Sequence, residues 1–164
     1  MSKLATLRDL YIEELRDLYS AENQITKALP KMIKAATSPE LKAAFEKHLK
    51  ETEGQITRLE TIFEGLGKSP KGKTCAAMKG LVEEGSELMG EDADPTVMDA
   101  GLIAAAQRVE HYEMAGYGTV RTFAKHLGEK EALKLLQATL DEEGATDKAL
   151  TTLAESVINA EATA

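Results

Sequence analysis

Four long segments of this 164-residue chain carry apolar residues at steps of three and four. This spacing puts the apolar side chains on one face of an α-helix and predicts an amphipathic helix in each segment. We expect long helices over about 4–36, from Pro39 to about Gly65, over about 96–127 and after Gly128, with a shorter helix from Cys75 to about Met89. The chain is therefore predicted to be all-α.

The lengths of the connections predict how these helices are arranged. Short loops join the first long helix to the second and the third to the fourth, so each pair should form an antiparallel hairpin. Residues 66–95 separate the two hairpins and are long enough to carry the chain back along the molecule. We expect one domain, residues 1–164, folded as a four-helix bundle with one long crossover that carries the short helix.

Charge and cysteine content limit the function classes. The formal net charge of -8 opposes binding to phosphate backbones and anionic membranes, so we expect neither nucleic acid nor a membrane as a partner. The single cysteine, Cys75, cannot form an internal disulfide. Residues 1–8 are too polar for a signal peptide, and no apolar run approaches the roughly 18 residues of a membrane span. We expect a soluble, cytoplasmic protein.

Polar residues interrupt the apolar stripes near the middle of each long helix. They are Glu22, Thr52, Glu110 and Glu143, and Glu51, Gln55, Glu113 and Asp147 lie within about a turn of them. Residues 49–59 and 140–150 are also weakly similar in sequence, as if the two hairpins were related by a pseudo-twofold axis. Such a bundle would bring the polar positions of all four helices to one level. The alternative to a buried layer is that these carboxylates lie on solvent-exposed helix faces.

Several carboxylates cannot stay ionised together in a buried layer without cations. Like charges raise one another's pKa, and burial adds a desolvation penalty. A pair of divalent metal ions would neutralise them, and oxygen ligands from the helices of a bundle are suited to iron or manganese. The sequence therefore predicts a carboxylate-rich dinuclear metal centre.

Four motifs resemble a known family. They are Asp17-Leu-Tyr-Ser-Ala-Glu-Asn-Gln24, His48-Leu-Lys-Glu-Thr-Glu-Gly-Gln55, Ala104-Ala-Ala-Gln-Arg-Val-Glu-His-Tyr-Glu113 and Leu140-Asp-Glu-Glu143 with Thr146-Asp147. Over nearly its whole length the chain resembles the YciF-like branch of ferritin-like bacterial stress proteins. The resemblance implies a ferritin-like bundle, a homodimer, a di-iron centre and a role in stress responses.

The resemblance also implies a set of metal ligands. Glu22 and Glu110 would serve from the first and third long helices, Glu113 would match the extra carboxylate of the rubrerythrin type, and Glu51 and Glu143 would serve from the second and fourth. Ferritin-like sites usually carry Glu-x-x-His on the second and fourth helices. Here Gly54 and Thr146 stand three residues beyond Glu51 and Glu143, so that motif is absent. Gln55 and Asp147 could substitute, and His48 could reach in.

Two function classes follow. In the first, the bundle binds two iron or manganese ions and oxidises Fe(II) with oxygen or peroxide. In the second, it is a non-enzymatic helical stress protein that acts by binding a partner, with metal absent or structural. The metal ligands expected in the first case are Glu22, Glu51, Glu110, Glu113, Glu143 and Asp147.

Overall fold

The computed structural model describes residues 4–164, which are almost entirely helical and contain no strand within that range. The helices are α1 (Leu7–Ala35), α2 (Pro39–Leu66), α3 (Ala76–Met89), α4 (Pro95–Leu127) and α5 (Lys130–Leu153), followed by a π-helical turn, η1 (Ala154–Ile158), and a short α6 (Asn159–Ala162). The all-α prediction is confirmed. None of the helices in this described part is long and apolar enough to cross a membrane.

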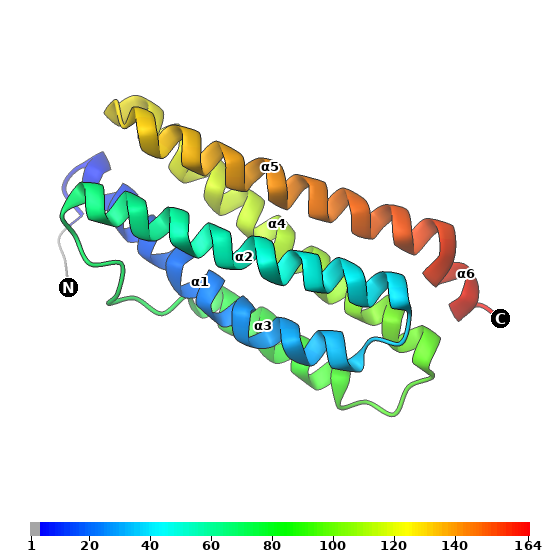
Figure 1. Ribbon diagram of the computed structural model, residues 1–164. Helices are drawn as coiled ribbons and strands as arrows, with labels where there is room; N and C mark the ends of the chain where they lie inside the picture. Colours follow the sequence, from blue (N-terminus) through cyan, green and yellow to red (C-terminus); the bar gives the residue numbers. More distant parts are fainter. Residues whose placement is uncertain (1–3) are drawn as a thin grey trace.

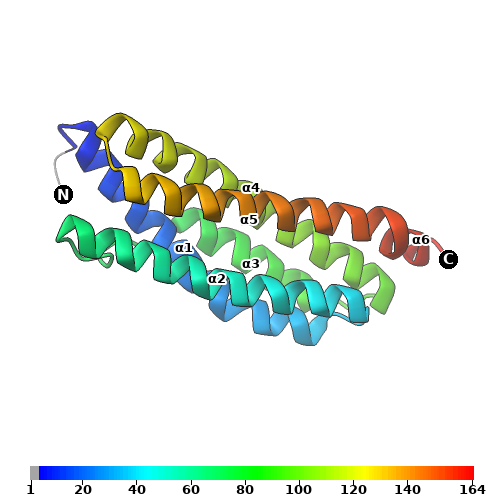
Figure 2. The same cartoon turned by 45° about the horizontal axis from the view of Figure 1, so that its top comes forward.

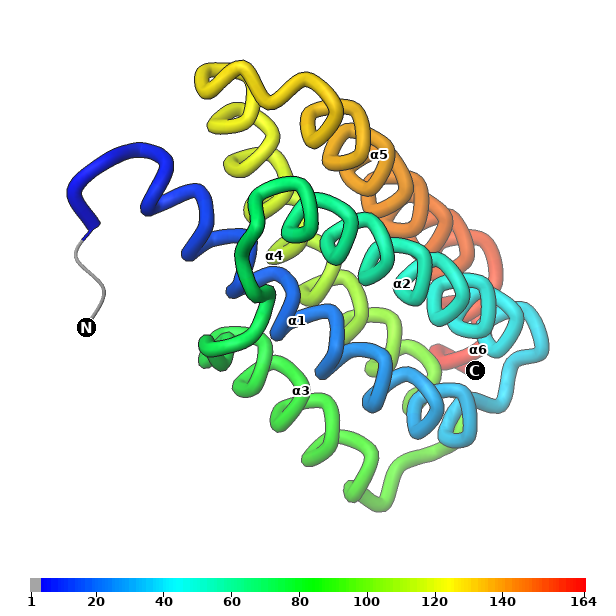
Figure 3. Tube along the Cα trace, turned by 60° about the vertical axis from the view of Figure 1, so that its left-hand side comes forward, coloured from blue at the N-terminus to red at the C-terminus, as the bar shows by residue number. Residues whose placement is uncertain are grey.

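The four long helices α1, α2, α4 and α5 form the bundle, and α3 lies outside it (Figure 1). The hairpins α1–α2 and α4–α5 pack side by side, so that α1 contacts α4 and α2 contacts α5. Helix α3 lies along α1 and α4, where it returns the chain between the two hairpins (Figures 2 and 3). This is the predicted four-helix bundle with one long crossover.

Local capping explains where the helices begin and end. Helix α1 begins at Leu7 rather than at the expected residue 4, because the side chain of Thr6 accepts a hydrogen bond from the amide of Asp9 and caps the helix. Ser38 caps α2 in the same way. At their C-terminal ends, α2 and α4 are closed by Gly67 and Gly128, with φ values of 62° and 73°, a left-handed conformation that favours glycine.

The interior consists of two apolar clusters with a polar layer between them. One cluster fills the end of the bundle near the α1–α2 turn and includes Ile25, Leu29 and Phe45. The other fills the opposite end and includes Leu15 and Leu59. Each long helix passes from one cluster to the other and carries its buried polar residues in between.

Three residues of the apolar run Leu102–Ala106 are covered within the chain. Leu102, Ile103 and Ala106 are buried in the same cluster as Met78 of α3, and Leu81 and Leu88 of that helix pack against the cluster. The structure assigns that cover to α3, because α3 lies directly against α4.

Candidate metal centre

The polar layer holds five ionisable side chains, one or two from each long helix. Glu22 lies on α1, His48 on α2, Glu110 and Glu113 on α4, and Glu143 on α5. All five are buried: His48 is 3% exposed and the four glutamates are 0% exposed. Buried carboxylates in this number are rare in proteins unless cations or hydrogen bonds compensate them.

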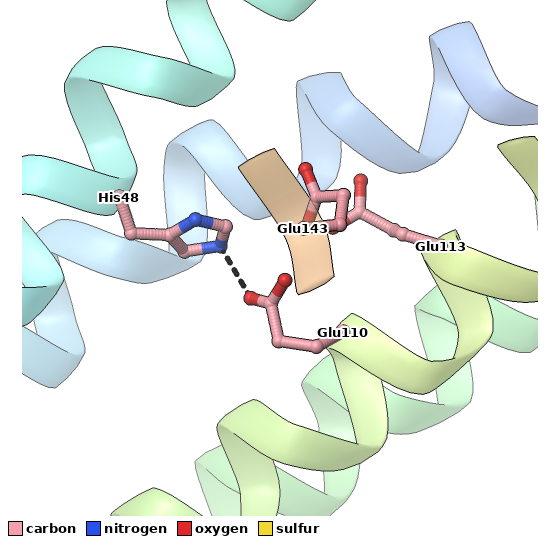
Figure 4. A group of neighbouring side chains, drawn as sticks. All are labelled: His48, Glu110, Glu113 and Glu143. Atoms are coloured by element: carbon pink, nitrogen blue, oxygen red, sulfur yellow. Dashed lines mark ion pairs between the residues drawn. The ribbon is translucent and has the colours of Figure 1, made fainter. Parts of the chain in front are cut away.

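Four of the five converge on one point. His48, Glu110, Glu113 and Glu143 each offer a ligand atom within 4.8 Å of those of the others (Figure 4). His48 Nε2 lies 2.8 Å from Glu110 Oε1. Ligands on opposite sides of a small divalent ion lie about 4 Å apart, so only a small adjustment would bring these atoms around an ion.

Seven of the eight carboxylate oxygens in this layer accept no hydrogen bond from residues 4–164. When these carboxyls are all ionised, neither oxygen of Glu110, Glu113 or Glu143 accepts a hydrogen bond from residues 4–164, and the same holds for Oε2 of Glu22. Only a protonated carboxyl can donate to its neighbour, as between Glu22 and Glu113 and between Glu110 and Glu143. The short contact between His48 and Glu110 is a close approach of the two groups and not an aligned hydrogen bond. Buried polar atoms in proteins are almost always satisfied. This buried cluster could therefore hold a metal ion, whose bonds would satisfy the unpartnered oxygens.

Burial and mutual repulsion raise the pKa of these carboxyl groups. Desolvation, followed by the charge of Glu143, raises the pKa of Glu22 to about 8. Desolvation also raises the pKa of Glu110 to about 7, with a further contribution from the charge of Glu22. The pKa values of Glu113 and Glu143 are raised well above the usual range, again mainly by desolvation. Without a cation, the layer thus favours protonated carboxyls at neutral pH.

Tyr117 fixes the orientation of Glu22. Its hydroxyl donates a hydrogen bond of 2.5 Å to Glu22 Oε1, and both side chains are buried. The remaining oxygen of Glu22, Oε2, is the one left without a partner. Tyr117 therefore holds one oxygen and leaves the other available as a ligand.

Glu51 and Asp147, two of the expected ligands, lie at the edge of the layer and outside the group of four. Their side chains are 22% and 21% exposed. Glu51 pairs with Lys47 at 3.4 Å, and Asp147 pairs with His111 at 3.2 Å. Gln107 also donates a hydrogen bond of 3.2 Å to Asp147. Their assignment as metal ligands stays a prediction.

Gln55 lies inside the layer, but one end of its amide group is already hydrogen-bonded. Its amide nitrogen donates to Glu142 at 3.1 Å, and Arg58 holds the same carboxylate through an ion pair of 2.6 Å. Its amide oxygen is buried without a partner. Gln55 is thus oriented by Glu142 and keeps one oxygen free.

From the sequence, His48 is only a side chain that could reach in, whereas the structure places it in the buried group of four. The apolar residues Leu49 and Ile56 are only half-buried, whereas their neighbours His48 and Gln55 are buried. The buried residues recur as 41, 45, 48, 52, 55, 59 and 62, a seven-residue repeat of alternating steps of four and three. Strict continuation of that repeat would have identified His48 from the sequence.

Comparisons with known proteins agree with this architecture. The family model described as "Domain of unknown function (DUF892)" matches residues 6–163. Protein YciF of Escherichia coli (strain K12) is 47% identical over 160 residues, which cover 97% of this chain and 96% of that protein.

Solved structures give the same result. The crystal structure described as that of the E. coli stress protein YciF superposes with a TM-score of 0.91, covering 95% of this chain and 99% of that one. YcfI of Rhodopseudomonas palustris is also 47% identical, with a TM-score of 0.89 over 92% of this chain and 96% of its own. A Xanthomonas campestris protein shares only 21% identity at a TM-score of 0.77, which shows the fold alone.

Proposed function

Because the chain belongs to the DUF892 family, and one of its relatives is described as a stress protein, we propose that it is a stress-response protein with a buried dinuclear iron or manganese centre. Glu22, His48, Glu110, Glu113 and Glu143 would hold the ions. The proposal further assigns to the centre the oxidation of Fe(II) by oxygen or peroxide.

One observation carries this proposal: three glutamates with both oxygens unpartnered, and one more with a single free oxygen, share a fully buried layer with one histidine. A layer built only for stability would be apolar, since apolar packing of the same volume is at least as stable as buried charge. Oxygen ligands with one imidazole suit iron or manganese better than soft, thiolate-binding metals. The donor set therefore fits the group that the fold family implies.

The residues of the chain would bind the ions and hold their own geometry. Glu110 and Glu113 are one turn apart on α4, so both carboxylates point into the bundle. His48 faces them from α2, and the hydroxyl of Tyr117 orients Glu22 by a hydrogen bond. The apolar clusters close the layer toward both ends of the bundle. Bound iron would supply the one-electron chemistry for reduction of oxygen or peroxide.

The test is metal content after anaerobic loading with Fe(II) or Mn(II). We expect about two ions per chain in the parent protein and fewer than half of that in a Glu110→Gln, Glu113→Gln variant. The matched control is Glu46→Gln, Glu53→Gln, which removes two exposed carboxylates from α2 and should bind as the parent does. Circular dichroism checks that each variant is folded.

Turnover is tested separately by oxygen and peroxide consumption on addition of Fe(II). Consumption that is lost in the Glu110, Glu113 variant and kept in the control would support the oxidase. Two tightly bound ions without consumption of oxygen or peroxide would contradict the oxidase and leave a metal centre with a structural role. No tight binding in the parent would remove the metal centre and favour the second function class, partner binding through the helical surface.

We also propose, on the family resemblance alone, that the molecule is a homodimer and works in the cytoplasm. Light scattering after gel filtration should then give about twice the chain mass of 17.7 kDa. A mass equal to one chain at micromolar concentration would contradict the dimer.

A further inference from the structure

A cavity of about 200 Å³ lies between α1, α3 and α4, on the side of the bundle that α3 covers. Its wall is mostly apolar and includes Leu29, Met32, Val82 and Val109. Two of its lining residues, His48 and Glu110, belong to the buried polar layer, whereas others lie at the surface. The cavity thus extends from the surface to the edge of the candidate metal centre.

The exposed end of this cavity is positively charged. Lys27 and Lys31 line it from α1, one helical turn apart, and both are exposed. Neither forms an ion pair or a side-chain hydrogen bond with any residue from 4 to 164. Glu110 is the one carboxylate among the lining residues, and it lies at the buried end. The surface end therefore attracts an anion, although the molecule as a whole is acidic.

An apolar wall with cations at its mouth matches an amphipathic anion. The apolar part of such a ligand would be removed from water in the cavity, and its charged end would stay solvated beside the two lysines. An engineered apolar cavity of about 150 Å³ holds benzene, so about 200 Å³ holds a chain of about eight carbon atoms. Ions and strongly polar molecules would lose their hydration in such a cavity.

We propose that the cavity between α1, α3 and α4 binds a medium-chain monocarboxylate, with its carboxylate at Lys27 and Lys31 and its hydrocarbon chain directed toward His48 and Glu110. Binding of this ligand needs no metal. It goes beyond the proposed metal centre and can be tested on metal-free protein, so failure of either idea is distinguishable from failure of the other.

The first test is calorimetric titration of the metal-free protein with hexanoate, octanoate, decanoate and dodecanoate. Each methylene that enters the cavity should tighten binding roughly fourfold. The gain should stop at about eight carbons, where the cavity is full. No saturable binding of octanoate at millimolar concentration, or a gain that continues unchanged through dodecanoate as for a nonspecific surface, would overturn the proposal.

The second test separates the contribution of the ligand's carboxylate from that of its hydrocarbon chain. Replacing both cations (Lys27→Gln, Lys31→Gln) should weaken octanoate roughly fivefold, because exposed ion pairs contribute little each. The same change should leave octanol, which has the chain without the carboxylate, unaffected. Lys34→Gln is the matched control, since Lys34 is exposed on the same helix but does not line the cavity. Equal losses for octanoate and octanol would contradict the assigned orientation.

The third test fills the cavity. Ala28 and Ala105 line it from α1 and α4, so Ala28→Leu or Ala105→Leu should weaken octanoate at least tenfold. Ala43→Leu, at an exposed position of α2, is the control. Circular dichroism confirms folding, and metal content is measured on the same variants. Unchanged octanoate binding in both folded cavity variants would place the ligand elsewhere and overturn the proposal.

Discussion

At the scale of single residues, the contact between Tyr117 and Glu22 is, within residues 4–164, the one hydrogen bond from a buried hydroxyl to a carboxylate of the polar layer. Tyr117→Phe removes this donor and leaves a second oxygen of Glu22 unpartnered. We expect a loss of about 1–2 kcal/mol in the free energy of unfolding, which lowers the melting temperature by about 2–8 °C.

The control for this change is Tyr19→Phe. Tyr19 donates a hydrogen bond of 3.1 Å to Glu60, but that bond is exposed to water. Its removal should shift the melting temperature by no more than about 1 °C. Thermal unfolding of the two metal-free variants side by side measures the difference, and equal shifts would show that burial of the Tyr117 bond adds nothing.

His48 gives a second prediction at this scale. Replacing the one imidazole of the group of four by His48→Gln should weaken metal binding at least tenfold, as loss of even supporting interactions does in metal sites. His126→Gln, which changes an exposed histidine near the end of α4, should have no effect. Competition with a chelator of known affinity measures both.

The same assay decides the position of the two edge residues. Glu51→Asn and Asp147→Asn should weaken metal binding less than His48→Gln does, because both side chains lie outside the group of four. Losses as large as that of His48→Gln would mean that metal binding draws Glu51 and Asp147 inward, as the sequence predicted.

At the scale of elements, Asp99 joins two hairpins that are distant in sequence. Its buried carboxylate on α4 accepts hydrogen bonds from the amides of Thr37 and Ser38 and from the hydroxyl of Thr37, at 2.7–2.8 Å. These donors lie in the α1–α2 turn, so Asp99 fixes that turn against the first turns of α4.

We expect Asp99→Ala to lower the free energy of unfolding by about 3 kcal/mol, because it leaves buried donors unpaired. The melting temperature should fall by about 6–12 °C. Asp92→Ala, in the exposed loop before α4, is the control and should leave it nearly unchanged. A fall of less than about 2 °C for Asp99→Ala would show that the turn holds its place without this residue.

At the scale of the whole molecule, the polar layer makes the stability of the metal-free protein depend on pH. The folded-state pKa values of Glu22 and Glu110, about 8 and about 7, lie above their ordinary value of 4.5. Groups whose pKa is raised by folding contribute stability that is fully present below the unfolded value and is lost as the pH rises through the folded value. The window is therefore about pH 4.5 to 8.

We expect the melting temperature of the metal-free protein to fall by about 12–24 °C between pH 5 and pH 8.5, because ionising Glu22 and Glu110 against their raised pKa values costs about 6 kcal/mol together. Bound metal should reverse this trend, because it binds the ionised carboxylates. The variant Glu110→Gln, Glu113→Gln should show a flatter profile. A metal-free parent whose melting temperature is constant over this window would contradict the raised pKa values.

The sequence by itself determined the helices, their order and the level of the polar layer. Apolar spacing predicted the long helices, and the loop lengths predicted the hairpins, because both signals are local to a few residues. Glu22, Glu110 and Glu143 could be named because each interrupts an apolar stripe with a charge.

Only the tertiary structure decided which polar side chains meet. On an α-helix, neighbouring positions differ by about 100° in direction, so His48 faces the layer and the adjacent Leu49 does not. Glu51 and Asp147 likewise lie close to the layer in sequence but turn to Lys47 and His111 at its edge. The cavity beside the layer depends on where α3 packs against α1 and α4, and that packing joins residues far apart in the chain.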